Sequence, residues 1–154
     1  MIGFFADKLG VEYPWNKYHQ IVARDYVSGA MENTTAVIHG EQANQMKGQL
    51  IDENKQENTI AHEIFHHWFG NLVTTESWSN LALNESFASY SEYLWREHKY
   101  GKDNANTHLF EDIEAYKNDA ANKDKKLVRF NYVDKEDMFD AVSYNKGGAI
   151  LHML

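Results

Sequence analysis

Two histidines and a glutamate at close spacing give the chain its clearest chemistry. His62, Glu63 and His66 form the pattern His-Glu-x-x-His. On a helix, residues four apart lie on one face, so the two imidazoles can reach one tetrahedral Zn²⁺. Glu63 falls about 100° round such a helix, beside the metal rather than on it. A carboxylate there can take a proton from a zinc-activated water, and this arrangement is typical of zinc metalloproteases.

A catalytic zinc needs a third protein ligand and one open position. Glu85 is the best candidate, because it opens a second helical pattern that ends at Gly101. The alternative is a chance match on an amphipathic helix with solvated polar groups, and a glutamate in this place argues against it. The apolar residues of the second pattern, expected to face the core, are Phe87, Tyr90, Leu94 and Trp95.

Two further motifs accompany the histidine pattern. Residues 29–33 read Gly29-Ala30-Met31-Glu32-Asn33, and residues 139–148 read Phe-Asp-Ala-Val-Ser-Tyr-Asn-Lys-Gly-Gly, in which the tyrosine is Tyr144. Together with the spacing from His66 to Glu85, these motifs resemble the M1 aminopeptidases, zinc peptidases of the gluzincin group. The resemblance runs from near residue 4 to the last residue.

The resemblance implies the cofactor and the catalytic groups. One Zn²⁺ per chain would be held by His62, His66 and Glu85, with Glu63 as the general base that later passes its proton to the leaving amine. Tyr144 would donate to the oxyanion that forms when water attacks the peptide carbonyl. Without the resemblance, Tyr144 is simply an interfacial or core tyrosine.

The second motif is the expected substrate-binding edge. Its small first residues, Gly29 and Ala30, let a peptide backbone approach closely and pair by strand addition, with Met31 beside an apolar first pocket. The resemblance implies that Glu32 binds the free α-ammonium group of the peptide, and that Asn33 belongs to the same binding segment. Read alone, Glu32 is a solvated carboxylate at a strand end.

The function expected from the resemblance is a zinc aminopeptidase that acts on peptides with a free N-terminus. Two alternatives remain open. One is an endopeptidase or an epoxide hydrolase on the same zinc core, since the 29–33 motif is shared with the latter. The other is a zinc-binding fragment without enzymatic activity, because the resemblance implies that residues 1–154 are part of a catalytic domain. The family's N-terminal β domain and C-terminal helical domain would then lie outside this chain.

Composition narrows the remaining classes. The 154 residues carry a net charge of −8 and 43% apolar residues, which fits one globular domain and disfavours a nucleic-acid partner. The absence of cysteine excludes disulfides and thiolate zinc sites but does not identify a compartment. No apolar stretch approaches the ~20 residues of a membrane span, and the start of the chain has no signal-peptide pattern. Oligomeric state and localisation are not indicated.

Periodicity and breakers predict an α+β fold, and the resemblance implies a thermolysin-like zincin domain in which short antiparallel strands pack beside the zinc-binding helices. The zinc site would lie between the two ligand-bearing helices, with a strand edge as one wall of the cleft. The expected elements are helices at 2–9, 54–69, 85–100 and 103–122, strands at 18–27 and 34–39, a weak strand at 127–133, and a helical segment after 139.

Four positions near the motifs need a separate interpretation. Three places depart from the family pattern, and we expect them to alter the shape of the pocket: Arg24, Ser86, and the stretch around Trp78, which carries one tryptophan where relatives often carry two. His67 follows a proposed ligand directly but would point about 100° away from it, so we place it behind the ligands at best.

Overall fold

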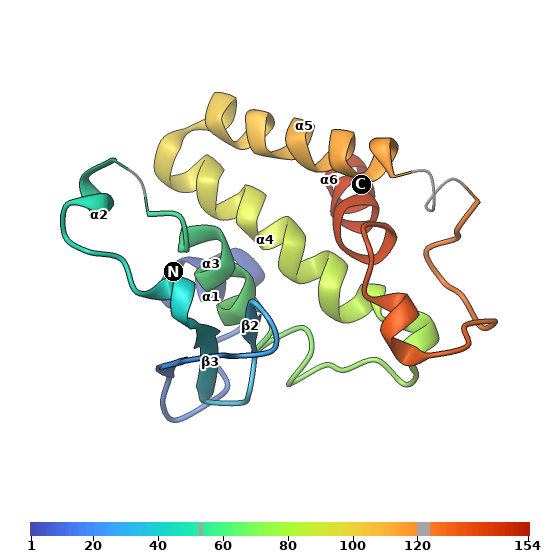
Figure 1. The fold of residues 1–154 in the computed structure, drawn as a ribbon, viewed down its shortest axis with the longest axis horizontal. Helices are drawn as coiled ribbons and strands as arrows, with labels where there is room; N and C mark the ends of the chain where they lie inside the picture. The colour runs from blue at the N-terminus through green and yellow to red at the C-terminus, as the bar shows by residue number, and fades with distance from the viewer. Residues whose placement is uncertain (53, 120–123) are drawn as a thin grey trace.

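The computed structural model describes residues 1–52, 54–119 and 124–154, which form a set of helices beside a small mixed sheet (Figure 1). The α+β class expected from the sequence is confirmed. The longer elements are helices α1 (Ile2–Leu9), α3 (Glu57–Phe65), α4 (Ala82–Tyr100), α5 (Lys102–Asn118) and α6 (Gly147–Met153), with strands β1 (His19–Ala23), β2 (Ala30–Met31) and β3 (Ala36–Gly40). The short ones are η1 (Glu41–Ala43), α2 (Gln49–Asp52), η2 (Trp78–Asn80), η4 (Lys135–Met138) and η5 (Val142–Lys146).

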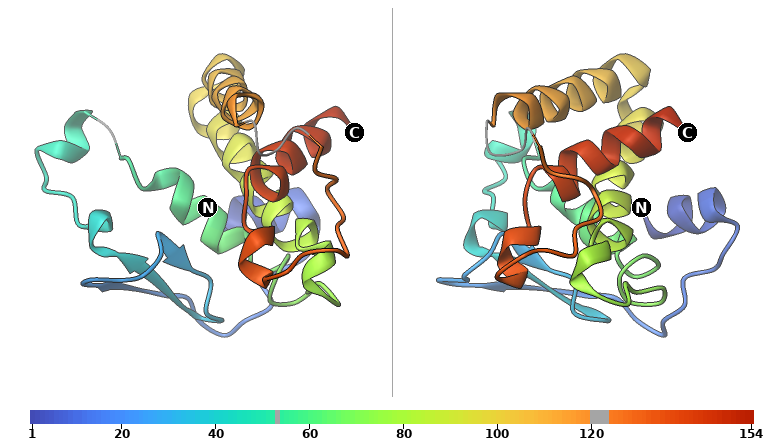
Figure 2. Two further views of the ribbon diagram at one scale, coloured as in Figure 1. Left: turned by 45° about the vertical axis from the view of Figure 1, so that its right-hand side comes forward. Right: turned by 90° about the vertical axis from the view of Figure 1, so that its right-hand side faces the viewer.

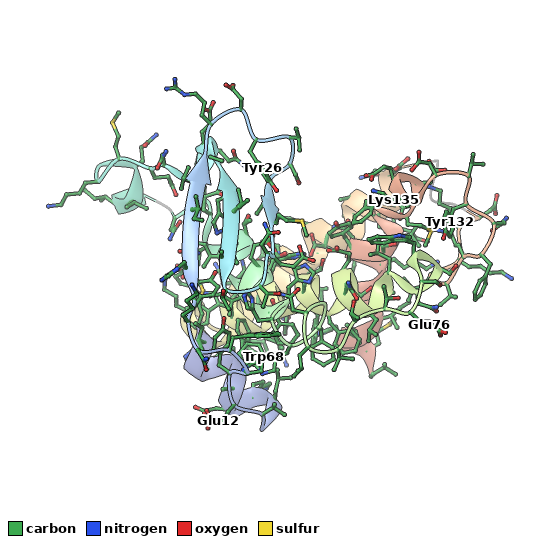
Figure 3. The ribbon with its side chains drawn as sticks, turned by 90° about the horizontal axis from the view of Figure 1, so that it is seen from below. Glu12, Tyr26, Trp68, Glu76, Tyr132 and Lys135 are labelled. Carbon is green, nitrogen blue, oxygen red and sulfur yellow. The ribbon has the colours of Figure 1, made fainter. Side chains whose placement is uncertain are left out.

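The sheet corrects the expectation of purely antiparallel strands. Its order is β1-β3-β2, with β3 antiparallel to β2 but parallel to β1. The chain reverses once to enter β2 and once more to enter β3, so β1 and β3 run the same way. A connection between parallel strands needs about a dozen residues, and residues 24–35 are long enough to provide it. Figure 3 shows the strands side by side, with Tyr26 on that connection.

Helix α4 packs against more of the helices than any other element does. It contacts α3, α5, α6 and η5 (Figures 1 and 2). Its predicted core residues Phe87 and Trp95 are partly buried and pack against the apolar core, as expected. The fully buried positions are mostly small, including Ser86, Ala88 and Ser91. Small side chains let neighbouring helices approach closely, a feature that apolar periodicity does not reveal.

The apolar core lies where α1 packs against α3, with Phe87 and Trp95 of α4 at its edge. Phe5 and Phe65 meet edge to face with their ring centroids 5.0 Å apart, and Ala61, Ile64 and Trp68 complete the buried cluster. Helix α1 ends as predicted at Gly10, whose φ of 65° is the left-handed conformation that glycine adopts without strain. This packing fixes the face of α3 that points away from the core.

Other predicted boundaries shift. The strand expected at 18–27 is shorter, the helix expected at 54–69 ends at Phe65, and the part of the 103–122 prediction at 120–122 lies outside the described residues. The strand expected at 127–133 is wrong, since this segment forms bends and irregular backbone. Phe130 and Val133 are 77% and 99% exposed there, so the apolar residues of the alternating pattern do not pack against another element. No helix among the described residues is long and apolar enough to cross a membrane.

Candidate active site

Helix α3 places the two histidines of the central motif side by side. The ring centroids of His62 and His66 are 4.8 Å apart. His62 donates from Nδ1 to Glu92 Oε1 over 2.9 Å, and His66 donates from Nδ1 to the Phe69 carbonyl over 3.0 Å. These bonds fix the tautomer of each ring and leave both Nε2 atoms for a metal.

Glu85 approaches both rings from the first turn of α4. Its Oε2 lies 3.3 Å from His62 Nε2 and 3.5 Å from His66 Nε2. The three side chains offer ligand atoms within 4.8 Å of one another. Two imidazole nitrogens and one carboxylate oxygen are a donor set that suits zinc and leaves one position open. The residues present therefore fit a catalytic zinc.

The electrostatics of the cluster favour a cation. Burial would raise the pKa of Glu85, but hydrogen bonds from the two histidines hold it well below its ordinary value. Burial would likewise lower the pKa of His62, yet Glu85 and Glu92 raise it well above the usual range. The site thus stabilises positive charge between buried carboxylates, a preference that a divalent cation satisfies.

Glu63 lies next to this cluster, and its pKa is shifted in the opposite direction from that of Glu85. It is 6% exposed, and its Oε2 is buried without a hydrogen-bond partner among the described residues. Burial raises its pKa to about 7, with the nearby Glu32 and Glu85 acting in the same direction against the two histidines. A carboxylate with a free oxygen and a pKa near neutrality can accept a proton at physiological pH.

Tyr144 reaches the cluster from η5, a π-helix. Its ring stacks over the His62 ring with the centroids 6.0 Å apart and the planes 16° apart. Burial, followed by the carboxylate of Glu85, raises the pKa of Tyr144 far above its usual value, so it remains a protonated hydroxyl. A neutral phenol is a hydrogen-bond donor, as stabilisation of an oxyanion requires. Single π-turns are frequent at functional sites.

A cleft of about 740 Å³ opens over these groups. Residues 27–32 of the loop and strand β2 line one side, and η4 and the segment after it line the other. In Figure 3 the connection that carries Tyr26 lies to the left and the segment that carries Lys135 to the right, both at the upper side of the helices. Of the predicted substrate edge, Gly29, Ala30, Met31 and Glu32 line the cleft.

Asn33 does not line the cleft. Its carbonyl accepts from the Ala36 amide over 2.8 Å, in the turn before β3. Glu32, in contrast, reaches within 3.9 Å of His66 Nδ1, and its carbonyl accepts from Asn71. The structure therefore brings one carboxylate of the substrate edge close to the histidine pair.

Two of the three departures from the family pattern lie outside the cleft lining. Arg24 is exposed and faces Glu41 at 3.9 Å, and Ser86 is buried against η5, donating to the Ser143 carbonyl over 2.6 Å. Only Trp78 lines the cleft. The expectation that all three shape the pocket is wrong for Arg24 and Ser86. The motif alone does not reveal that the Arg24 side chain is exposed beside Glu41 and that the Ser86 side chain is buried against Ser143.

Sequence reasoning missed Glu92, which holds His62. Its signal was available, because Glu92 lies seven residues after Glu85, two turns further along the same face of α4. His67 lies behind the ligands as expected. It is fully buried, donates from Nδ1 to the Glu63 carbonyl and accepts at Nε2 from the Thr35 amide, so it ties α3 to the turn before β3.

Comparison with known proteins gives one consistent result. Residues 1–154 match the Peptidase family M1 domain. The chain is 40% identical to Aminopeptidase M1-A of Oryza sativa subsp. japonica, over 97% of this chain and 18% of that protein. It is 35% identical to Endoplasmic reticulum aminopeptidase 2 of Bos taurus, over 100% of this chain and 17% of that protein.

A solved structure agrees with the sequence matches. The fold resembles the crystal structure of an M1 zinc metallopeptidase E323A mutant from Deinococcus radiodurans, with a TM-score of 0.73 and 25% identity over 98% of this chain and 30% of that one. The chain thus spans 17–18% of the length of these curated relatives. Because the domain match covers every residue, the chain belongs to peptidase family M1.

Proposed function

We propose that this chain carries the zinc site of an aminopeptidase, which hydrolyses the first peptide bond of substrates with a free N-terminus. The observation that carries the proposal is the convergence of His62 Nε2, His66 Nε2 and Glu85 Oε2 beside an oxygen of Glu63 that has no hydrogen-bond partner in the described part of the chain. We further propose that residues 1–154 are part of a thermolysin-like catalytic domain.

The ligands and the base have distinct tasks. His62, His66 and Glu85 would hold one Zn²⁺ per chain. Bound zinc supplies a Lewis acid that polarises the scissile carbonyl and lowers the pKa of water. Glu63 takes the proton of the attacking water on its free oxygen and delivers it to the leaving amine. Its pKa of about 7 suits both transfers.

Tyr144 and Glu32 act on the substrate. The Tyr144 hydroxyl donates to the oxyanion that forms on the carbonyl oxygen when water adds to the carbonyl carbon, and the stacking of the Tyr144 ring on His62 keeps the tyrosine beside the proposed zinc ligands. Glu32 accepts from the α-ammonium group of the first residue, which sets the distance from the N-terminus to the cleaved bond. The free edge of β2 offers backbone groups to an extended peptide.

Elemental analysis after dialysis against metal-free buffer tests the metal site. We expect about one zinc per chain in the wild type and a large loss in Glu85→Ala. Glu111→Ala, at an exposed glutamate of α5, is the matched control and should keep its zinc. Equal zinc in Glu85→Ala and the wild type would remove Glu85 as a ligand.

A paired substrate assay tests the aminopeptidase role. An aminoacyl anilide with a free amine should be cleaved, and its N-acetylated counterpart should be cleaved far more slowly, because Glu32 then lacks a cation to bind. Equal rates would refute the role of Glu32 and favour an endopeptidase. Zinc binding without cleavage of either substrate would indicate that this chain is a metal-binding piece without activity of its own.

A further inference from the structure

Helix α5 contributes no residue to the cleft lining, yet two of its polar residues face inward. His108 and Asp112 have side chains only 12% and 27% exposed. Helix α4, which carries Glu85, lies between α5 and α3 (Figure 1). His108 reaches this helix, because it contacts Glu92. Ionisable groups are seldom buried without a partner, and the partners here lead to the candidate zinc site.

The contacts run from α5 in two directions. His108 Nε2 lies 3.3 Å from Glu92 Oε2 and 3.6 Å from Asp112 Oδ2. The other oxygen of Glu92 accepts from His62 Nδ1 over 2.9 Å. The other oxygen of Asp112 accepts from the amide of Asn145 over 2.9 Å. His108 therefore stands between the carboxylate that holds His62 and the carboxylate that holds η5.

These contacts close into a ring. Asn145 directly follows Tyr144, and the Tyr144 ring stacks over His62. A proposed metal ligand and the proposed oxyanion donor are thus both anchored, through one carboxylate each, at a single histidine outside the cleft.

Charge explains why His108 can hold both carboxylates. Burial would lower the pKa of His108, but Glu92 and Asp112 raise it above its ordinary value. Burial would raise the pKa of Glu92, but the neighbouring His108 and His62 lower it to about 2. Among the described residues His108 Nε2 makes no well-aligned hydrogen bond, so its attraction to both carboxylates is ionic rather than directional. A cation between two buried anions offsets their repulsion and their desolvation.

We propose that His108 is a positioning residue for the zinc site. It holds Glu92 in contact with His62 and Asp112 in contact with Asn145, and through these two contacts it orients both the proposed ligand His62 and Tyr144. This inference rests on the proposed zinc role of His62. Groups that orient a metal ligand from behind typically change metal affinity by about 10–100-fold when removed.

Zinc affinity, measured by competition with a chromophoric chelator, tests the first half. We expect His108→Leu to bind zinc about 10-fold more weakly than the wild type. His108→Lys retains a cation and should recover part of the loss, whereas His108→Gln keeps a donor without the charge and should resemble His108→Leu. The control is Asn106→Ala, which removes a different α4–α5 contact, the hydrogen bond from Tyr93 over 3.2 Å, and should change affinity less than twofold.

Tyrosine-labelled NMR tests the second half without requiring activity. The resonance of Tyr144, assigned with Tyr144→Phe, should shift in His108→Leu and in Asn145→Ala but not in Asn106→Ala. Wild-type zinc affinity and an unshifted Tyr144 resonance in folded His108→Leu would overturn the proposal. Equal losses of affinity in Asn106→Ala and His108→Leu would also overturn it, by showing that helix packing alone is responsible.

The two proposals fail in different ways. If the wild type bound no zinc, the proposed function of this chain would fail, while the Tyr144 resonance would still report whether His108 positions η5. If the wild type bound one zinc and lost it in Glu85→Ala, but His108→Leu matched the wild type in both measurements, the positioning role alone would be refuted.

Discussion

Two equally buried glutamates on helix α3 have pKa values shifted in opposite directions, because only one of them is fully hydrogen-bonded. Glu57 and Glu63 are each 6% exposed. Glu57 accepts from Trp95, Lys99 and Tyr100, and these donors lower its pKa against the effect of burial. Glu63 leaves one oxygen unpartnered among the described residues, and burial raises its pKa to about 7. The first carboxylate is built into the fold, whereas the second is free to exchange a proton.

Glu63→Gln should separate chemistry from metal binding. The amide has the shape of the carboxylate but cannot accept the proton of water, so we expect kcat to fall by about 10²–10⁴-fold. Zinc content should remain that of the wild type if the metal is held by His62, His66 and Glu85 and not by the second convergent group, Glu32, Glu63 and His66. Steady-state kinetics and elemental analysis on the same preparation check both statements. Loss of zinc in this variant would show that Glu63 is a ligand instead.

Tyr144→Phe should lower kcat while leaving KM and zinc affinity nearly unchanged. The hydroxyl is needed only when charge develops on the carbonyl oxygen, and loss of one such donor costs about 10²–10³-fold. Tyr132→Phe, at a tyrosine that does not line the cleft, is the matched control. A rise in KM with unchanged kcat would assign Tyr144 to substrate binding.

At the scale of elements, Glu57 joins the start of α3 to the end of α4. Its carboxylate accepts from Trp95 Nε1 over 2.9 Å and from Lys99 and Tyr100. Glu57→Ala leaves partly buried donors without an acceptor, so we expect a loss of about 1–3 kcal/mol in the free energy of unfolding. Glu57→Gln, which keeps an acceptor oxygen, should lose less.

The pH dependence of this contact follows from the direction of its pKa. A carboxylate whose folded pKa is lowered contributes its full stability above the unfolded value of about 4.3 and loses it as pH falls through the folded value. The stability difference between wild type and Glu57→Gln should therefore be constant above about pH 5 and shrink in acid. Urea unfolding at several pH values measures it, and a difference that grew in acid would contradict the assignment.

The contact between α4 and α6 depends on the absence of one side chain. A Cβ on Gly147 would lie 1.8 Å from Ser86 Oγ and 2.5 Å from Ser86 Cβ. We expect Gly147→Ala to destabilise the fold and Ser86→Gly to relieve part of that loss, with a coupling of about 1–3 kcal/mol in a double-mutant cycle. Gly148→Ala meets only an ordinary contact of 3.6 Å and serves as the control. Additive effects of the two substitutions would contradict the close approach.

Local signals predicted those elements whose ends carry breakers or motifs. Gly10 and Gly101 end α1 and α4 as expected, and the motif placed His62 and His66 on one face of a helix. The strand at 127–133 failed because alternation alone does not supply a partner strand. The role of α4 as the central helix was not visible, since most of its buried residues are serines, alanine and polar side chains, and Tyr93 is its one large buried aromatic residue.

At the scale of the whole molecule, the cleft joins parts that are distant in sequence. Its lining comes from residues 27–32, from α3, from the start of α4 and from the segment around η4 and η5. Pairings of this kind, such as His62 with Glu92 or Asp112 with Asn145, depend on how helices cross and cannot be deduced from spacing within one segment. The parallel pairing of β1 with β3 was missed for the same reason.

A bound cation should therefore stabilise the molecule as a whole. Glu32, Glu63 and Glu85 repel one another in the cleft, and a divalent ion between α3 and α4 offsets that repulsion. At a zinc concentration 100-fold above Kd, linkage adds about 2.7 kcal/mol to the free energy of unfolding. For a chain of this size, that raises Tm by about 5–10 °C. Calorimetry should show this rise in the wild type and in Glu111→Ala, but not in Glu85→Ala. An equal rise in Glu85→Ala would mean that zinc binds elsewhere, at exposed histidines such as His19 and His98.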